Sequence, residues 1–109
     1  MDNLQVSFDK NSSNEKVLKV NLEGMLIDMN AYDFKSDLLN ILREKNQNCI
    51  IDIRELRDID IVGMNALAVV HKELYNSGLS LTILSKNHSE VERLFTLTKF
   101  DSLLNIKRA

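Results

Sequence analysis

The chain has 109 residues, of which 44% are hydrophobic and 28% are charged, and its formal net charge is -2. This length suits one domain with its own core, and the small negative charge offers no basic field to nucleic acid or to an anionic membrane. The single cysteine, Cys49, has no disulfide partner, and the two histidines, His71 and His88, lack the spacing of zinc ligands.

The first predicted elements are two paired strands. Apolar and polar residues alternate over Leu4–Phe8 and again over Leu18–Leu22, and the polar stretch Lys10–Asn14 separates them. Two alternating runs around a polar turn are typical of a β-hairpin, and Gly24 would end it.

A first helix is predicted near residues 31 to 45. Asn30 can serve as its N-cap, with Asp33 three residues later in a weak form of the capping box. The apolar residues that then recur at helical spacing are Phe34, Leu38, Ile41 and Leu42.

The apolar run Cys49–Ile53 is predicted to be a central strand buried on both faces. The charged residues Arg54, Glu55, Arg57 and Asp58 would then form a solvated loop. A second helix is expected over Met64–Asn76, with a stop at Gly78. Its apolar stripe consists of Met64, Leu67, Val70 and Leu74.

The last predicted elements are a strand over Leu79–Leu84, a third helix and a strand over Leu103–Ile106. Ser89 and Glu92 have capping-box spacing, and the helix behind them would bury Val91, Leu94 and Phe95. The resulting order is β-β-α-β-α-β-α-β, which predicts an α/β fold with a mixed, mostly parallel sheet and right-handed crossover helices. We expect residues 1–109 to form a single domain.

The stretch around residues 50 to 70 resembles the STAS domain family, which includes anti-sigma factor antagonists and the tails of sulfate transporters. The resemblance rests on the third strand with Glu55 and Leu56, on Ile59 and Asp60, and on Gly63 before a helix rich in small residues. The segments Leu22–Gly24 and Leu94–Phe95 extend it over nearly the whole chain. It implies a STAS-like fold, whose working edge lies where this strand leads into the helix.

In phosphorylated bacterial members the stretch reads Asp-Ser-Ser-Gly, and a partner serine kinase modifies the first serine. The corresponding positions here hold Ile61 and Val62, and Ile53–Asn76 contains no Ser or Thr. The acidic residue that commonly follows the glycine after strand two also differs, because Ile27 stands there with Asp28 beside it. We therefore expect no serine switch.

The resemblance places partner binding on the turn and on the start of the second helix. Asp60 can instead cap the helix, and Gly63 is more readily explained by the backbone than by a contact. Ile61 and Val62 form a dry docking spot if they are exposed. The complete set of predicted partner-binding residues is Asp28, Asp58, Asp60, Ile61, Val62, Gly63, Met64 and Asn65.

Catalysis is not expected from this sequence. No Ser or Cys has a nearby base in a recognisable arrangement, and three glycines do not form a phosphate loop. Asp52 and Lys86 faintly resemble the aspartate and lysine of a receiver domain, but only Glu23 stands where that fold needs an acidic pair. We predict neither a metal site nor a cofactor.

Two functions are therefore compatible with the sequence. One is a regulatory module of the anti-sigma factor antagonist type, whose partner is a kinase-like anti-sigma factor. The other is a STAS subunit of a transporter, signalling or ligand-sensing assembly. Because the chain stops at Ala109, we expect the C-terminal helix of many members to be missing, so that a homodimer or partner would cover the exposed sheet. The absence of a signal peptide and of a long apolar run indicates a cytoplasmic protein.

Overall fold

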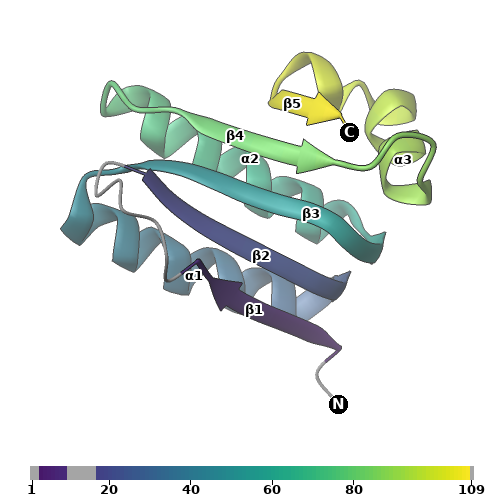
Figure 1. The fold of residues 1–109 in the computed structure, drawn as a ribbon, viewed down its shortest axis with the longest axis horizontal. Helices are drawn as coiled ribbons and strands as arrows, with labels where there is room; N and C mark the ends of the chain where they lie inside the picture. The colour runs from purple at the N-terminus through teal and green to yellow at the C-terminus, as the bar shows by residue number, and fades with distance from the viewer. Residues whose placement is uncertain (1–2, 10–16, 109) are drawn as a thin grey trace.

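The computed structural model describes residues 3–9 and 17–108, in which five strands form one mixed sheet connected by helices (Figure 1). The elements in chain order are β1 Leu4–Phe8, β2 Val17–Leu26, α1 Asp28–Lys45, β3 Asn48–Ile59, α2 Ile61–Asn76, β4 Leu81–Ser85, α3 Glu90–Thr98, the 3₁₀ turn η1 Phe100–Ser102 and β5 Asn105–Arg108. This order confirms the predicted fold class. The predicted turn at Lys10–Asn14 lies outside the described residues.

The strands lie in the sheet in the order β1-β2-β3-β4-β5, which is also their order in the chain. β1 is antiparallel to β2, and every later pair is parallel. Each crossover therefore moves the chain in the same direction, and right-handed crossovers then place their helices on the same face of the sheet. Figure 1 shows α1 and α2 side by side behind the sheet.

The core lies between the sheet and these helices. On the three central strands, seven residues that face the helices are less than 3% exposed, and the predicted stripe of α2 packs against them. These strand residues are Val20, Leu22, Cys49, Ile51, Ile53, Leu81 and Ile83. α3 adds Val91 and Phe95 to the same core, as predicted, whereas Leu94 of its predicted apolar face is only half-buried.

The opposite face of the sheet has no core of its own among the described residues. Ile50 and Leu84 on this face are only half-buried, and their neighbours in the register are Lys19, Asp52 and Thr82. The prediction that β3 is buried on both faces is therefore wrong for Ile50. The reason is topological, since all crossovers place their helices on the other face.

Several element boundaries differ from the prediction. α1 begins at Asp28 rather than at residue 31, because Asn30 lies inside its first turn. β3 continues through the predicted charged loop, and α2 begins directly afterwards at Ile61. β5 begins at Asn105, two residues later than predicted. The stop at Gly78 is confirmed, since its φ is +75° and its N–H donates to the carbonyl of Tyr75.

Candidate functional site

The second half of β3 leads to the edge of the sheet where the parallel strands end and α1 and α2 begin. Two register shifts against β2 leave extra residues on β3, one between Asp52 and Glu55 and one between Leu56 and Asp58. Such bulges rotate the strand, so burial recurs every third residue instead of every second. Ile53, Leu56 and Ile59 are buried, and the four charged side chains between them are exposed.

Asp60 forms the whole connection between β3 and α2 and holds the two helix starts together. Its Oδ1 accepts a hydrogen bond from the N–H of Gly63 at 2.9 Å, which makes it the N-cap of α2. Its Oδ2 accepts from the N–H of Asp28, the first residue of α1, at 3.0 Å. One carboxylate therefore binds amide groups at the starts of both helices, as expected for an acidic side chain at a helix N-terminus.

Gly63 is required by a close backbone approach. A Cβ atom at this position would lie 2.2 Å from the carbonyl oxygen of Leu26 and 2.7 Å from Cγ1 of Ile59. The first turn of α2 therefore lies directly against the end of β2. The N–H of Asp60 also donates to the carbonyl of Leu26, at 3.3 Å.

The start of α1 is fixed without a capping side chain at Ile27. Oδ1 of Asn30 accepts from the N–H of Ile27 at 2.8 Å, and Nδ2 of Asn30 donates to the carbonyl of Met25 at 3.0 Å. The backbone of Asp28 has a φ of +48°, in the left-handed region. Asn30 and Asp60 together fix the turn that leads from β2 into α1.

The predicted partner-binding residues differ in their exposure. Ile61 is 64% exposed, and Asp28, Asp58 and Asn65 are also exposed. Val62 is half-buried against the core, and Asp60 and Gly63 form the turn. Met64 is 4% exposed and belongs to the core, which corrects its assignment to the binding surface. A side chain on the apolar stripe of α2 faces the sheet, so Met64 could not serve both purposes.

Two exposed side chains of α1 extend this surface. Met29 is 68% exposed and adjoins Asp28, and Tyr32 is 52% exposed one helical turn later. The ammonium group of Lys35 lies 4.4 Å from the centre of the Tyr32 ring. We use the name α1–α2 edge for the exposed residues Asp28, Met29, Tyr32, Ile61 and Asn65. The exposure of Tyr32 was missed from the sequence, because its position just before the buried stripe of α1 gave no sign of it.

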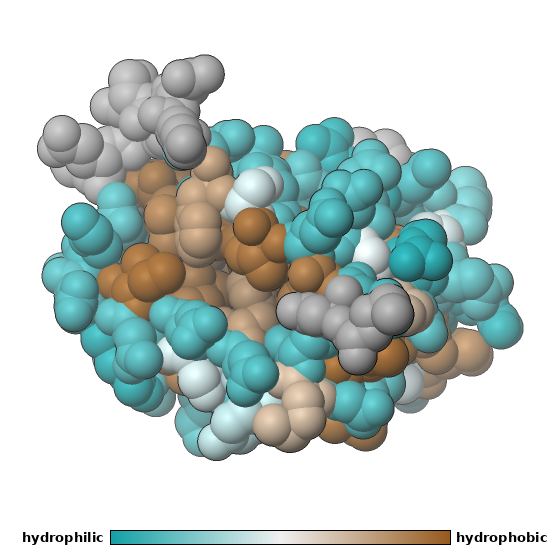
Figure 2. Space-filling model, turned by 90° about the horizontal axis from the view of Figure 1, so that it is seen from below, coloured by the Kyte–Doolittle hydropathy of each residue, from teal (hydrophilic) through white to brown (hydrophobic). Residues whose placement is uncertain are grey.

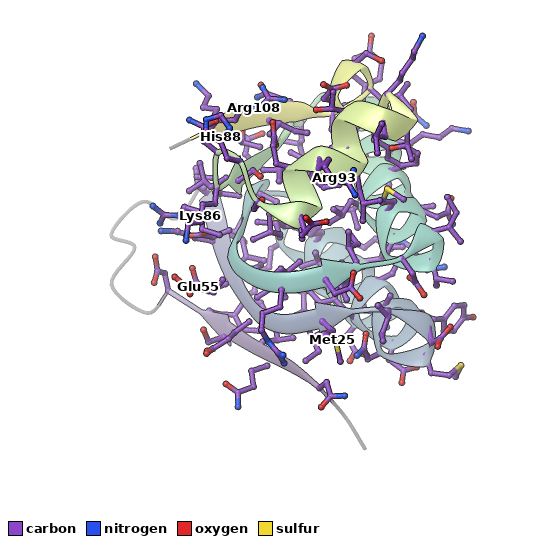
Figure 3. All side chains as sticks on the ribbon, turned by 90° about the vertical axis from the view of Figure 1, so that its right-hand side faces the viewer. Met25, Glu55, Lys86, His88, Arg93 and Arg108 are labelled. Carbon is purple, nitrogen blue, oxygen red and sulfur yellow. The ribbon has the colours of Figure 1, made fainter. Side chains whose placement is uncertain are left out.

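A polar cleft lies elsewhere at the same edge of the sheet, between α3 and β5. It has a volume of about 630 Å³ and is lined by Asn87, His88, Ser89, Glu90, Glu92, Arg93, Thr96 and Arg108. Figure 3 views this edge and shows His88, Arg93 and Arg108 around α3, away from Met25 at the end of β2. The guanidinium group of Arg108 pairs with Glu92, so acidic and basic groups neutralise each other there.

The residues that resembled a receiver site form a different arrangement. Asp52 forms a bidentate pair with the guanidinium group of Arg54, and this partner lowers the pKa of the Asp52 carboxyl below its ordinary value. Within residues 3–9 and 17–108, His, Cys, Asp and Glu form no group of three that could hold a metal ion. None of the helices in this part of the chain has the length and apolar character to cross a bilayer.

The family model of the STAS domain matches residues 10–109. No curated protein matches the sequence.

Solved structures share the fold at low sequence identity. An anti-sigma factor antagonist from Mycobacterium paratuberculosis is 17% identical, with a TM-score of 0.76 over 94% of this chain and 84% of that one. The anti-sigma factor antagonist SpoIIAA in its unphosphorylated form is 13% identical, with a TM-score of 0.76 over 94% and 88%. The Thermotoga maritima protein TM1081 is 19% identical, with a TM-score of 0.77 over 94% and 79%.

Proposed function

Because the chain belongs to the STAS domain family, we propose that it is a non-catalytic regulatory module of the anti-sigma factor antagonist type. Its partner would be a protein, and a kinase-like anti-sigma factor fits this role best. The partner would bind the α1–α2 edge together with Asp58 and the turn at Asp60. Two structural neighbours that are themselves anti-sigma factor antagonists support this assignment.

The observation that carries the proposal is the exposure of Ile61. A β-branched apolar side chain, 64% exposed, projects from the first turn of α2 beside a backbone fixed by Asp60 and Gly63. Binding that covers such a residue is favourable, because apolar surface is removed from water. The rigid turn also loses little conformational entropy on binding. Met29 and Tyr32 add apolar area, and Asp28 and Asn65 supply polar groups around it.

We further propose that serine phosphorylation does not switch this turn. The two positions that hold serines in the phosphorylated members are Ile61 and Val62, and neither side chain has a hydroxyl group. In those members a phosphate on the turn would oppose docking by its charge and bulk. Here the amount of the protein would control the interaction.

The test compares Ile61→Glu and Ile61→Ser with the wild type in binding a kinase-like anti-sigma factor encoded in the same genome. We expect Ile61→Glu to weaken binding at least about tenfold, since it places a charge in the contact, and Ile61→Ser to keep binding. Isothermal titration calorimetry measures both effects. Leu97→Glu on α3 is the matched control, because Leu97 is 65% exposed and lies outside the α1–α2 edge.

Incubation with the anti-sigma factor and ATP tests the missing switch. We expect the wild type to remain unmodified at the turn and the Ile61→Ser variant to gain a phosphate that intact-mass measurement detects. Equal affinity of the wild type and Ile61→Glu would overturn docking through the turn. Phosphorylation of the wild type at any Ser or Thr that lowers its affinity for the anti-sigma factor would overturn the claim that the switch is absent.

The second possible function is that of a subunit in a transporter, signalling or ligand-sensing assembly. Stable co-purification with a larger subunit would distinguish it from the antagonist type. A subunit that stays bound to a larger assembly is expected to present a broad apolar interface. The open face of the sheet instead carries mainly polar side chains, such as Lys19, Asn21 and Thr82. We therefore prefer the antagonist type.

A further inference from the structure

Strand β1 forms one edge of the sheet, and β5 forms the opposite edge. The N–H of Asp9 donates to the carbonyl of Lys19 at 3.1 Å, and the N–H of Met25 donates to the carbonyl of Asn3 at 2.9 Å. The odd-numbered residues of β1 therefore turn their backbone groups toward β2. In an antiparallel pair the residues between them turn theirs away, so the N–H and C=O groups of Val6 and Phe8 point out from the sheet.

The side chains of the same two residues are also exposed. Val6 pairs with Leu22 and Phe8 pairs with Val20 in the register, so both lie on the face of the sheet that the helices cover. Even so, Val6 is 41% exposed and Phe8 is 40% exposed, because they lie at the margin of that layer. Figure 2 views the molecule from the β1 side and shows apolar residues gathered among hydrophilic ones.

The two edges of the sheet differ in their protection. β5 carries Lys107 and Arg108, and the guanidinium group of Arg108 contacts Glu92 and Asp101. Charged side chains on an edge strand oppose pairing with another strand. β1 reads Leu-Gln-Val-Ser-Phe and contains no charged residue and no proline. Within Leu4–Phe8, the N-terminal edge therefore lacks the charges and prolines that keep other edge strands from pairing.

We propose that β1 pairs with the β1 strand of a second copy, so that two sheets join into one continuous sheet. An antiparallel arrangement with its two-fold axis at Ser7 places Val6 of each copy opposite Phe8 of the other. The outward N–H and C=O groups of these residues then bond to each other, and a β-branched residue meets an aromatic one, which is a favourable cross-strand pair. The proposal is independent of the function assigned to the α1–α2 edge.

A second copy is the occupant that fits this strand best. In the register centred on Ser7, Val6 faces Phe8, Ser7 faces Ser7 and Gln5 faces Asp9. None of these pairs brings two like charges together, although each chain has a net charge of -2. A five-residue strand is only about 17 Å long and buries less than the roughly 1,200 Å² of a stable interface. The dimer is therefore expected to dissociate on dilution.

Sedimentation equilibrium of the full chain from micromolar to millimolar concentration tests the association. We expect the average mass of the wild type to rise toward that of two chains. Val6→Lys should weaken the dimer at least about tenfold, because it adds a charge to each copy at the joined edge. Leu97→Lys, which changes an exposed apolar residue far from β1, should associate like the wild type.

Cysteine cross-linking at exposed positions of β1 tests the register. The two Ser7 residues would form a non-hydrogen-bonded pair with Cα atoms about 4.5 Å apart, within disulfide range. Ser7→Cys should therefore form a covalent dimer under mild oxidation, and Gln5→Cys, which faces Asp9 of the second copy, should not. A wild type that stays monomeric at millimolar concentration, a dimer that survives Val6→Lys, or equal cross-linking by both cysteine variants would overturn the proposal.

Discussion

At the scale of single residues, Asp60 and Gly63 fix the geometry of the candidate site. One aspartate accepts hydrogen bonds from amides in the first turns of two helices, and one glycine lets the start of α2 lie against the carbonyl of Leu26. These two contacts hold the backbone on either side of Ile61 and Val62, so the position of the exposed Ile61 side chain is fixed by the turn.

Gly63→Ala should destabilise the fold by about 1–3 kcal/mol, since the added methyl group would displace a backbone carbonyl in a packed region. Urea unfolding followed by circular dichroism measures this change. Gly78→Ala is the control, because Gly78 has no heavy atom within 4 Å of the added Cβ and loses only its favourable left-handed conformation. A smaller effect at Gly63 than at Gly78 would contradict the close approach.

Asp60→Ala should cost about 1–2 kcal/mol, because the N-cap of α2 and the acceptor for the Asp28 amide are both lost. Asp60→Asn keeps one side-chain oxygen and should cost less. Thermal unfolding of the two variants beside the wild type gives the order of stability. If both variants unfold at the same temperature as the wild type, the carboxylate does not stabilise the turn.

The Asp52–Arg54 pair predicts a dependence of stability on pH. The hydrogen bonds from Arg54 lower the pKa of Asp52 in the folded protein, so the pair stabilises the fold above the ordinary aspartate pKa of about 3.9. This contribution is lost as the pH falls below that value and Asp52 becomes protonated. The stability difference between the wild type and Asp52→Asn should therefore shrink below about pH 4, as urea unfolding at several pH values can show.

At the scale of elements, the sequence predicted the type of every helix and strand and misplaced several of their ends. Alternation revealed β1 and β2, and helical spacing revealed α1 and α2, because these patterns directly reflect which face is buried. The second half of β3 was missed, since its bulges give Ile53, Leu56 and Ile59 a three-residue period that neither a simple strand nor a helix has.

The start of α1 was misplaced for a different reason. Asn30 was expected to cap the helix from outside, but it binds the amide of Ile27 from within the first turn. The bond from Asp60 to the Asp28 amide joins residues 32 positions apart, so no local pattern could predict it. For the candidate site, the sequence predicted the role of Asp60 as a cap and placed Met64 on the apolar stripe of α2, whereas the exposure of Ile61 depended on where α2 begins.

Asn30→Ala should destabilise the protein by about 1–2 kcal/mol, because two half-buried hydrogen bonds are lost at once. Asn40→Ala, at an exposed position of the same helix, is the control for helix propensity. Chemical unfolding measures the difference between the two variants. Equal stabilities would show that the turn between β2 and α1 does not depend on Asn30.

At the scale of the whole molecule, one core connects all three helices to the sheet. The radius of gyration is 12.9 Å, close to the roughly 13 Å of a compact domain of this length. We therefore predict that the chain unfolds in one cooperative transition, with equal calorimetric and van't Hoff enthalpies in differential scanning calorimetry. Two resolved transitions would contradict a single domain.

The order of the strands also bears on how the protein is made. Since the strands lie in the sheet in the order in which they are synthesised, each one that leaves the ribosome can join the edge left by its predecessor. No strand has to be inserted between two that have already paired, so the sheet can grow in one direction as translation proceeds.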